Sequence, residues 1–131
     1  MVGSNQKPTS GNKAVEGRLS VKVNGGQEEL RAFSFFDIGG SLTFQFGDAN
    51  SVTGVVSTRF PKDKLGQEVQ QGAADVNVSY RVNGEFVSWS GGNLRVAEDG
   101  AGGYEGNLSA VISAPGSSWN LTEGSFSIIN N

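Results

Sequence analysis

The chain has 131 residues, a formal net charge of −3 and neither cysteine nor histidine, which excludes disulfides, thiolate metal sites and hydrolases of the Ser-His-Asp type. Because no basic cluster is present, a nucleic-acid partner is not expected, and no apolar run approaches the ~20 residues of a membrane-spanning helix. The length fits a single domain, and the 20 glycines favour strands and tight turns over helices.

The first 16 residues form a polar segment, MVGSNQKPTSGNKAVE, with the composition of a flexible tether and without the apolar stretch of a signal peptide. We therefore expect a flexible N-terminal tether over 1–16 and a single β domain over 17–131. Two origins stay open. The chain is either an exported protein whose leader has been replaced by Met1, or a cytoplasmic protein with an ordinary frayed terminus. Export to the periplasm, the cell surface or the medium is favoured.

Apolar and polar residues alternate through the first half of the chain, as they do in half-buried strands. The dipeptide Asn24-Gly25 ends the first of these rows and can supply the positive φ angles of a tight hairpin turn. Gly39-Gly40 turns the chain again. Strands are predicted over 19–23, 30–38, 42–46 and 52–60.

The alternation breaks over 61–71, where the sequence is PKDKLGQEVQQ. Leu65 and Val69 are four residues apart, a spacing that places two side chains on one face of a helical turn. Gly66, between them, weakens the helix. We predict one short helix near 61–71, or a loop in its place, that covers one end of the sheet.

Alternation then returns, and Asn83-Gly84 is the strongest hairpin signal in the chain, predicting a type I′ turn. Gly106, inside a later strand, predicts a bulge or a point where another group approaches the backbone closely. Further strands are predicted over 76–82, 86–89, 94–96 and 104–112.

The last predicted strand contains a change of parity. Trp119 and Leu121 are odd-numbered, whereas the later apolar residues Phe126 and Ile128 are even-numbered, so strict alternation would place the two pairs on opposite faces. A bulge near Glu123-Gly124 would restore one face. The alternative is a bend at which the strand passes from one sheet to another.

These elements amount to about eight or nine strands joined mostly by short turns. The predicted fold is all-β, an antiparallel β-sandwich or flattened barrel with the one short helix near 61–71. The residues expected to face the core are Leu42, Phe44, Phe46, Val52, Val56, Val76, Val78, Tyr80, Leu108 and Ile112.

Three aromatic residues are the candidate ligand-binding residues. Trp89 lies in FVSWSGG and Trp119 in GSSWNLTEG, so both rings have small polar neighbours near a turn. An exposed ring beside hydroxyls and amides offers a flat apolar platform with polar groups at its edge, as sugar recognition requires. Tyr104, which follows the glycine-rich turn over 98–103, is the third candidate. The alternative is that the rings pack in the core or at its rim, because aromatic residues dominate protein cores.

The acidic residues Asp37, Asp48, Glu98, Asp99 and Glu105 lie in or beside predicted turns. Paired carboxyl groups can act as acid and base when their environments separate their pKa values. The pattern favours turn chemistry instead, because Asp side chains accept hydrogen bonds from nearby backbone groups in turns. We expect no catalytic residue, no metal site and no cofactor.

Several segments resemble small exported or lipid-anchored bacterial β-domains of uncharacterised function. These segments are GRLSVKVNGG, FPKDKLGQEV, YRVNGEFVSWSGGNLRV and LTEGSFSII, so the resemblance covers most of the chain from Gly17. It implies an exported all-β domain without a catalytic signature. The sequence lacks the lipid-bearing cysteine of such precursors, so the resemblance does not extend to the anchor.

Together these observations favour a monomeric, non-catalytic, exported binding module whose partner is a glycan or a protein surface. Two alternatives stay open. One is a barrel that carries a small apolar ligand in its lumen, and the other is a carboxylate-dependent hydrolase. A filled core would favour the binding module, an apolar lumen the carrier, and two carboxyl groups converging in a cleft the hydrolase.

Overall fold

The computed structural model describes residues 15–129, in which ten β-strands and one three-residue 3-10 helix form. All but the last two residues of the predicted tether lie outside the described residues, and Glu16 is the first residue of the first strand. The elements are β1 (Glu16–Val23), β2 (Gly26–Ile38), β3 (Ser41–Phe46), β4 (Val56–Pro61), η1 (Lys62–Lys64), β5 (Glu68–Gln70), β6 (Asn77–Val82), β7 (Glu85–Ser88), β8 (Gly91–Glu98), β9 (Tyr104–Ala114) and β10 (Ser117–Ile129).

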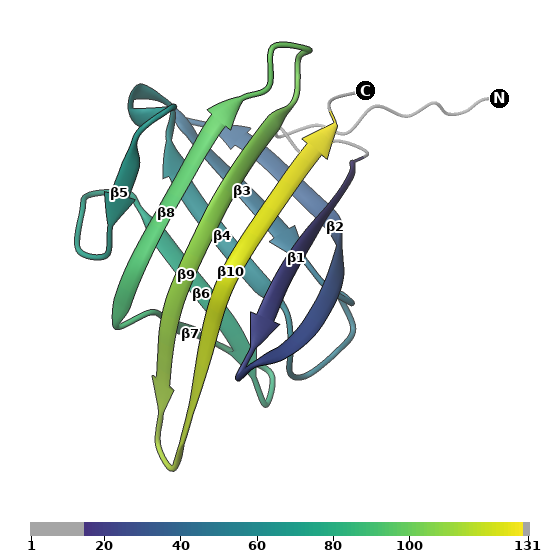
Figure 1. The fold of residues 1–131 in the computed structure, drawn as a ribbon, viewed down its shortest axis with the longest axis vertical. Coiled ribbons are helices and arrows are strands. Elements are labelled where there is room, and N and C mark those ends of the chain that lie inside the picture. Colours follow the sequence, from purple (N-terminus) through teal and green to yellow (C-terminus); the bar gives the residue numbers. More distant parts are fainter. Residues whose placement is uncertain (1–14, 130–131) are drawn as a thin grey trace, which may run out of the picture.

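The strands form one antiparallel sheet in the order β5-β8-β9-β10-β1-β2-β3-β4-β6-β7. The sheet curls on itself into a half-barrel, so that β8, β9, β10 and β1 form one layer and β3, β4 and β6 lie behind them (Figure 1). The predicted all-β antiparallel class is confirmed. Within residues 15–129, no helix has the length and apolar character needed to cross a bilayer.

The two ends of the half-barrel carry different turns. We name the end with the turns at Asn83-Gly84 and Pro115-Gly116 the lower end, and the end with the turns at Gly39-Gly40 and 99–103 the upper end (Figure 1). The predicted type I′ turn is present at the lower end, where Asn83 and Gly84 have φ angles of 51° and 86°.

The 13-residue strand β2 connects the two layers. Its first part pairs with β1 as far as Arg31, and its second part pairs with β3 from Ala32 onward. The register with β3 shifts between Ala32 and Ser34. Such a bulge bends a strand and increases its twist, which allows one continuous sheet to cover both sides of the core.

The parity change in the last strand is a bulge, as the first of the two predicted explanations required. The register of β10 against β9 shifts between Leu121 and Gly124, and Glu123 has a φ angle of 54°. Beyond the shift, Phe126 and Ile128 are buried like Leu121. The bulge therefore keeps the apolar residues of both halves of β10 on the core side of one strand.

Aromatic rings from both layers fill the centre of the half-barrel. Phe35 stacks on Phe44 with ring centroids 5.3 Å apart. In the other layer, the ring centroid of Phe126 lies 5.7 Å from that of Phe44 and 5.5 Å from that of Phe46. The interior between the layers is thus packed with side chains at this level.

Nine of the ten predicted core residues are buried, and the prediction is wrong for Val52, which is 63% exposed. The strand predicted over 52–60 begins only at Val56, as β4. Gly54 has a φ angle of 108°, outside the range of a regular strand, so the residues before it belong to a loop. The apparent alternation across this glycine therefore does not report one strand.

The prediction of a short helix near 61–71 is correct only for the three residues of η1, and the predicted eight or nine strands are fewer than the ten that form. Glu68–Gln70 forms β5, which pairs with β8, and the N–H of Gly66 donates to the carbonyl oxygen of Val96 at 2.8 Å. Leu65 and Val69 therefore do not share a helical face. The long-range pairing with β8 overrides the local spacing of these residues.

Gly106 is a point of close approach, one of its two predicted roles. A Cβ atom at this position would overlap the ring of Phe126 and the carbonyl oxygen of Arg95. The missing side chain thus allows the Phe126 ring to lie directly against the β9 backbone.

Candidate functional site

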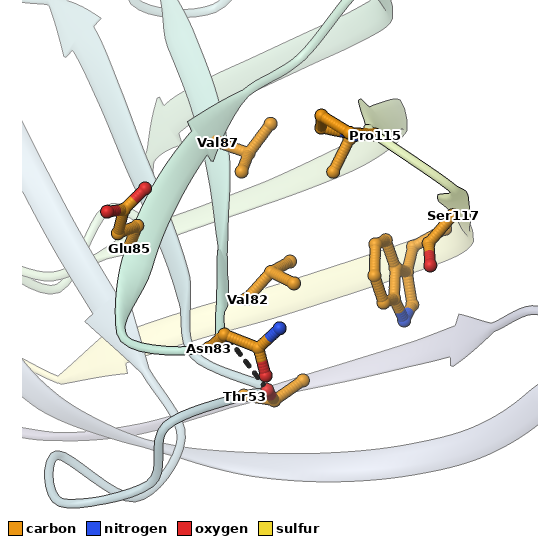
Figure 2. A pocket seen from close by; sticks show the side chains of 9 residues that line it. Thr53, Val82, Asn83, Glu85, Val87, Pro115 and Ser117 are labelled. Carbon is orange, nitrogen blue, oxygen red and sulfur yellow. Dashed lines mark hydrogen bonds between the residues drawn. The ribbon is translucent and has the colours of Figure 1, made fainter.

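A cleft of about 430 Å³ opens at the lower end, between the β6–β7 hairpin and the β9–β10 hairpin (Figure 2). The tip of the β9–β10 hairpin projects beyond the rest of the sheet (Figure 1), and Pro115 and Ser117 at this tip line the cleft. The lining residues are Thr53, Val82, Asn83, Glu85 and Val87 on one side, and Ala114, Pro115, Ser117 and Trp119 on the other.

The loop over 47–55 fixes the β6–β7 side of the cleft. The N–H of Gly84 donates to the carbonyl oxygen of Val52 at 2.7 Å, and the N–H of Asn83 donates to Thr53 Oγ1 at 3.1 Å (Figure 2). These bonds occupy the backbone of the turn itself. The wall formed by the turn is therefore held in place before any ligand arrives.

Arg81 anchors the same loop from the other direction. Its Nη1 donates to the carbonyl oxygens of Ala49 and Ser51 at 2.9 and 3.1 Å, and its guanidinium lies 4.8 Å from the centroid of the Phe86 ring. Arg81 is thus committed to loop structure and to the outer face of β7. Its charge does not line the cleft.

Trp119 supplies the aromatic surface of the cleft. Its ring is partly exposed and packs on the buried ring of Tyr80, with centroids 5.8 Å apart and planes tilted by 43°. Burial raises the pKa of the Tyr80 hydroxyl above its usual value, and the charge of Glu28 raises it further. The platform beneath Trp119 therefore remains neutral across the physiological pH range.

Polar groups surround this apolar surface. Asn83 offers an amide, Ser117 a hydroxyl and Glu85 a carboxylate, all on exposed residues, while Val82 and Val87 are partly buried. The side chains of Val82 and Val87 project into the space between the Asn83 turn and the Pro115 tip (Figure 2). The cleft can thus offer both donors and acceptors around an aromatic and aliphatic floor.

Trp89, the second predicted aromatic platform, lies in the core and is 5% exposed. It sits where the chain crosses from β7 to β8. The backbone N–H of Trp89 donates to the carbonyl oxygen of Val78 at 2.8 Å. The backbone N–H of the next residue, Ser90, donates to the carbonyl oxygen of Val111, also at 2.8 Å. The ring fills the interior at this crossing and presents no surface to a ligand.

Tyr104, the third predicted binding residue, lies at the opposite end of β9 from the Trp119 cleft. The register places Tyr104 opposite Ile128 and Trp119 opposite Ile112. The partly buried Tyr104 ring packs against Phe35 and Phe44 at the upper end, with ring centroids 5.9 and 5.7 Å apart. The structure therefore does not bring the three aromatic candidates together.

An ion pair lies beside Tyr104 at the upper end. Lys62 Nζ is 2.7 Å from Asp37 Oδ1, and this hydrogen bond raises the pKa of Lys62. Burial raises the pKa of Tyr104, and the charge of Asp37 raises it further. Asp37 is thus engaged with a cation, which leaves it poorly placed to act as a general base.

Two other acidic residues serve turns, as the sequence predicts. Asp48 Oδ1 accepts a hydrogen bond from the N–H of Asn50 at 3.0 Å. Asp99 Oδ1 accepts bonds from the N–H groups of Ala101 and Gly103 at 2.7 and 3.0 Å. Across the part of the chain that the structure describes, no three acidic side chains gather closely enough to hold a metal ion.

Sequence reasoning missed the polar residues that accompany Trp119. The dipeptide Asn83-Gly84 did predict a hairpin turn, and therefore an exposed tip, at this position. No local signal indicated that this tip would face Ser117 and Trp119, which are more than thirty residues away along the chain. That juxtaposition follows from the curl of the sheet.

No protein-family model, curated protein or solved structure matches this chain.

Proposed function

We propose that the chain is a non-catalytic binding module that takes a carbohydrate in the Trp119 cleft at the lower end of the half-barrel. The observation that carries the proposal is the partly exposed Trp119 ring in a cleft whose other walls offer an amide, hydroxyls and a carboxylate. The export that the sequence favours, and the monomeric state, are parts of the same proposal.

The composition of the cleft matches the chemistry of a sugar ring. A pyranose has an apolar face of C–H groups and a rim of hydroxyls, so it needs a flat aromatic surface and several polar partners at the edge. Trp119 supplies the surface, and Asn83 and Ser117 supply side chains that both donate and accept. The volume of about 430 Å³ lies within the ~300–1,000 Å³ of small-molecule sites.

The cleft is also preorganised on the side of the β6–β7 hairpin. The bonds from Asn83 and Gly84 to the 47–55 loop hold that wall, so binding need not order it. A site that is rigid before binding avoids part of the entropy cost of association. This supports recognition of a small ligand, whose few contacts could not offset a large ordering cost.

The packed centre favours the cleft over a lumen as the binding site. The contacts of Phe44 with Phe35 and Phe126 occupy the space between the layers in which an apolar carrier would hold its ligand. Of the carboxylates among the described residues, Glu85 is the one that lines the cleft. A single carboxylate does not provide the acid and base pair that glycoside hydrolysis requires.

The proposal is tested by titrating the protein with a panel of mono- and oligosaccharides and following tryptophan fluorescence and heat of binding. We expect Trp119→Ala to weaken binding of the best sugar by about 10- to 30-fold, the loss typical of an aromatic hot spot. Phe86→Ala is the matched control, because Phe86 is an aromatic residue on β7, 40% exposed, that does not line the cleft. Equal affinity in the Trp119 variant, or a panel without any binder, would overturn the proposal.

A further inference from the structure

A second groove, of about 310 Å³, lies on the outer face of the sheet where β1, β2 and β10 run side by side. Arg18 and Arg31 line it together with Ser127, Glu16 and Ile129. None of these residues lines the Trp119 cleft, which opens at the lower end. The groove is therefore a separate feature of the surface.

The two arginines lie directly opposite each other. Arg18 of β1 and Arg31 of β2 are Cα partners in the antiparallel register, and Ser127 of β10 is the partner of Arg18 on its other side. Side chains of directly opposed residues lie on the same face of the sheet, with Cβ atoms about 4.5–5.5 Å apart. Like charges in this arrangement destabilise a sheet. Glu16 and Glu29, each two residues from one arginine along its strand, lie on the same face and offset part of this cost.

No carboxylate within residues 15–129 forms an ion pair with either arginine. The ion pairs between described residues use Lys22, Arg59 and Lys62 as their cations. Glu16 lines the same groove, two residues before Arg18 on β1. The acidic residue Glu105 is one strand farther away, opposite Ser127 in the register.

We propose that this groove, defined by Arg18, Arg31 and Ser127, is an anion site that takes the phosphate group of a phosphate monoester. One guanidinium matches the two oxygens and single charge of a carboxylate, whereas two adjacent guanidiniums match a group with about −1.5 to −2 charges and three acceptor oxygens. The Ser127 hydroxyl adds a neutral donor beside them. The exposed Ile129 side chain offers an apolar contact for whatever carries the phosphate.

The opposed charges give the proposal a signature that a merely solvated surface would not show. Replacing either arginine by glutamine removes the repulsion, so Arg31→Gln and Arg18→Gln should each raise the melting temperature by about 1–3 °C in phosphate-free buffer. The same variants should lose the additional stabilisation that phosphate or glycerol phosphate gives to the unchanged protein at constant ionic strength. Stability and binding would thus change in opposite directions.

Arg95→Gln is the matched control. Arg95 lies on β8 in the same layer, but its Nη1 donates to Asn107 Oδ1 at 3.3 Å and it does not line the groove. This variant should keep the full response to phosphate, which separates the site from the general effect of phosphate as a stabilising salt. Trp119→Ala should also keep it, so that failure of this proposal and failure of the carbohydrate proposal are distinguishable.

Two further arms identify the carrier of the phosphate. Soluble glycerol phosphate is compared with phosphatidylcholine vesicles that do or do not contain phosphatidic acid, whose headgroup is also a phosphate monoester. Arginine-dependent binding to the soluble ester alone assigns a soluble ligand, and arginine-dependent binding to phosphatidic acid vesicles assigns a lipid headgroup. The proposal is overturned if neither binds, if the two arginine variants respond like Arg95→Gln, or if neither arginine variant is more stable than the unchanged protein without phosphate.

Discussion

The two ends of the half-barrel place a partly buried aromatic ring in different surroundings. At the upper end, the Tyr104 ring packs over Phe35 and Phe44, and the ion pair of Lys62 with Asp37 lies beside it. At the lower end, the Trp119 ring packs on Tyr80 but leaves part of its surface on a cleft. Tyr104 therefore lies beside an ion pair, whereas Trp119 borders a cleft with polar walls.

The difference shows what decides whether an aromatic residue near a turn becomes part of the core or part of a site. Tyr104 and Trp119 are both partly buried and pack against the core. The β9–β10 hairpin, however, projects past the sheet (Figure 1), and Trp119 is the third residue of β10. The neighbouring residues of Trp89 and Trp119 are similarly small and polar. The position of each ring relative to the curl, and not its local sequence, sets its role.

The largest expected effect separates these two tryptophans. Trp89→Ala removes a ring that is 5% exposed at the crossing between the layers, so it should lower the free energy of unfolding by about 3–5 kcal/mol. Trp119→Ala removes a partly exposed ring and should lower the free energy of unfolding by clearly less than Trp89→Ala does. Urea denaturation followed by circular dichroism measures both. Equal losses would show that Trp119 is a core residue like Trp89.

A smaller effect distinguishes two glycines, one from each layer. Gly106→Ala places a Cβ atom against the Phe126 ring and the Arg95 carbonyl oxygen, and this overpacking should cost about 1–3 kcal/mol. A Cβ atom at Gly84, at the lower end, would meet no atom within 4 Å, so the cost of Gly84→Val comes mainly from the φ angle of 86° and should be about 1 kcal/mol.

The two glycine variants also differ in whether a second substitution can recover the lost stability. Phe126→Leu removes the ring that crowds position 106 and should recover part of the loss in Gly106→Ala, but none of the loss in Gly84→Val. A double-mutant cycle on thermal melts measures the coupling. Gly84→Val with an unchanged melting temperature would contradict the type I′ assignment.

The smallest effect is a pH dependence, to which Lys62 and Tyr104 at the upper end and Tyr80 at the lower end contribute. The pKa values of Lys62 and Tyr104 in the folded protein are raised above their ordinary values of 10.5 and 10.0. For groups whose folded pKa is raised, the stability contribution is complete below the unfolded pKa and is lost as the pH rises through the folded pKa. The melting temperature should therefore fall above about pH 10.

Asp37→Asn provides the control for this pH dependence. It removes the carboxylate that raises both pKa values, so the variant should lose less stability between pH 9 and 11 than the unchanged protein. Differential scanning calorimetry across this range measures the difference. A steeper decline in the variant would contradict the account of the upper end.

Much of the fold follows from local patterns in the sequence. The Asn83-Gly84 turn and the bulge at Glu123-Gly124 were both predictable, because the conformations they need are encoded by the residues that adopt them. The prediction that Val52 faces the core was wrong because Gly54 interrupts an alternation of apolar and polar residues that is continuous in the sequence. Strand β5 was not predicted because its pairing partner β8 lies more than twenty residues farther along the chain.

The candidate site was less accessible to sequence reasoning than the fold. Trp119 was identified by its polar neighbours, but the same criterion selected Trp89, which is buried. The sequence did not identify three other residues of the cleft, Asn83, Glu85 and Ser117, as ligand-binding residues. They come to line one cleft with Trp119 only when the sheet curls. The opposed pair of Arg18 and Arg31 likewise needs the register of β1 and β2 before it is visible.

The place of β1 in the sheet has a consequence for how the protein is made. β1 lies in the interior of the sheet order, between β10 and β2, and Glu16 pairs with Ile129 at the far end of the described chain. During translation, one edge of β1 therefore waits unpaired until β10 has left the ribosome. Such contacts between distant residues slow folding and leave strand edges exposed to other chains. The nascent chain should consequently need protection from aggregation until its last strand has been synthesised.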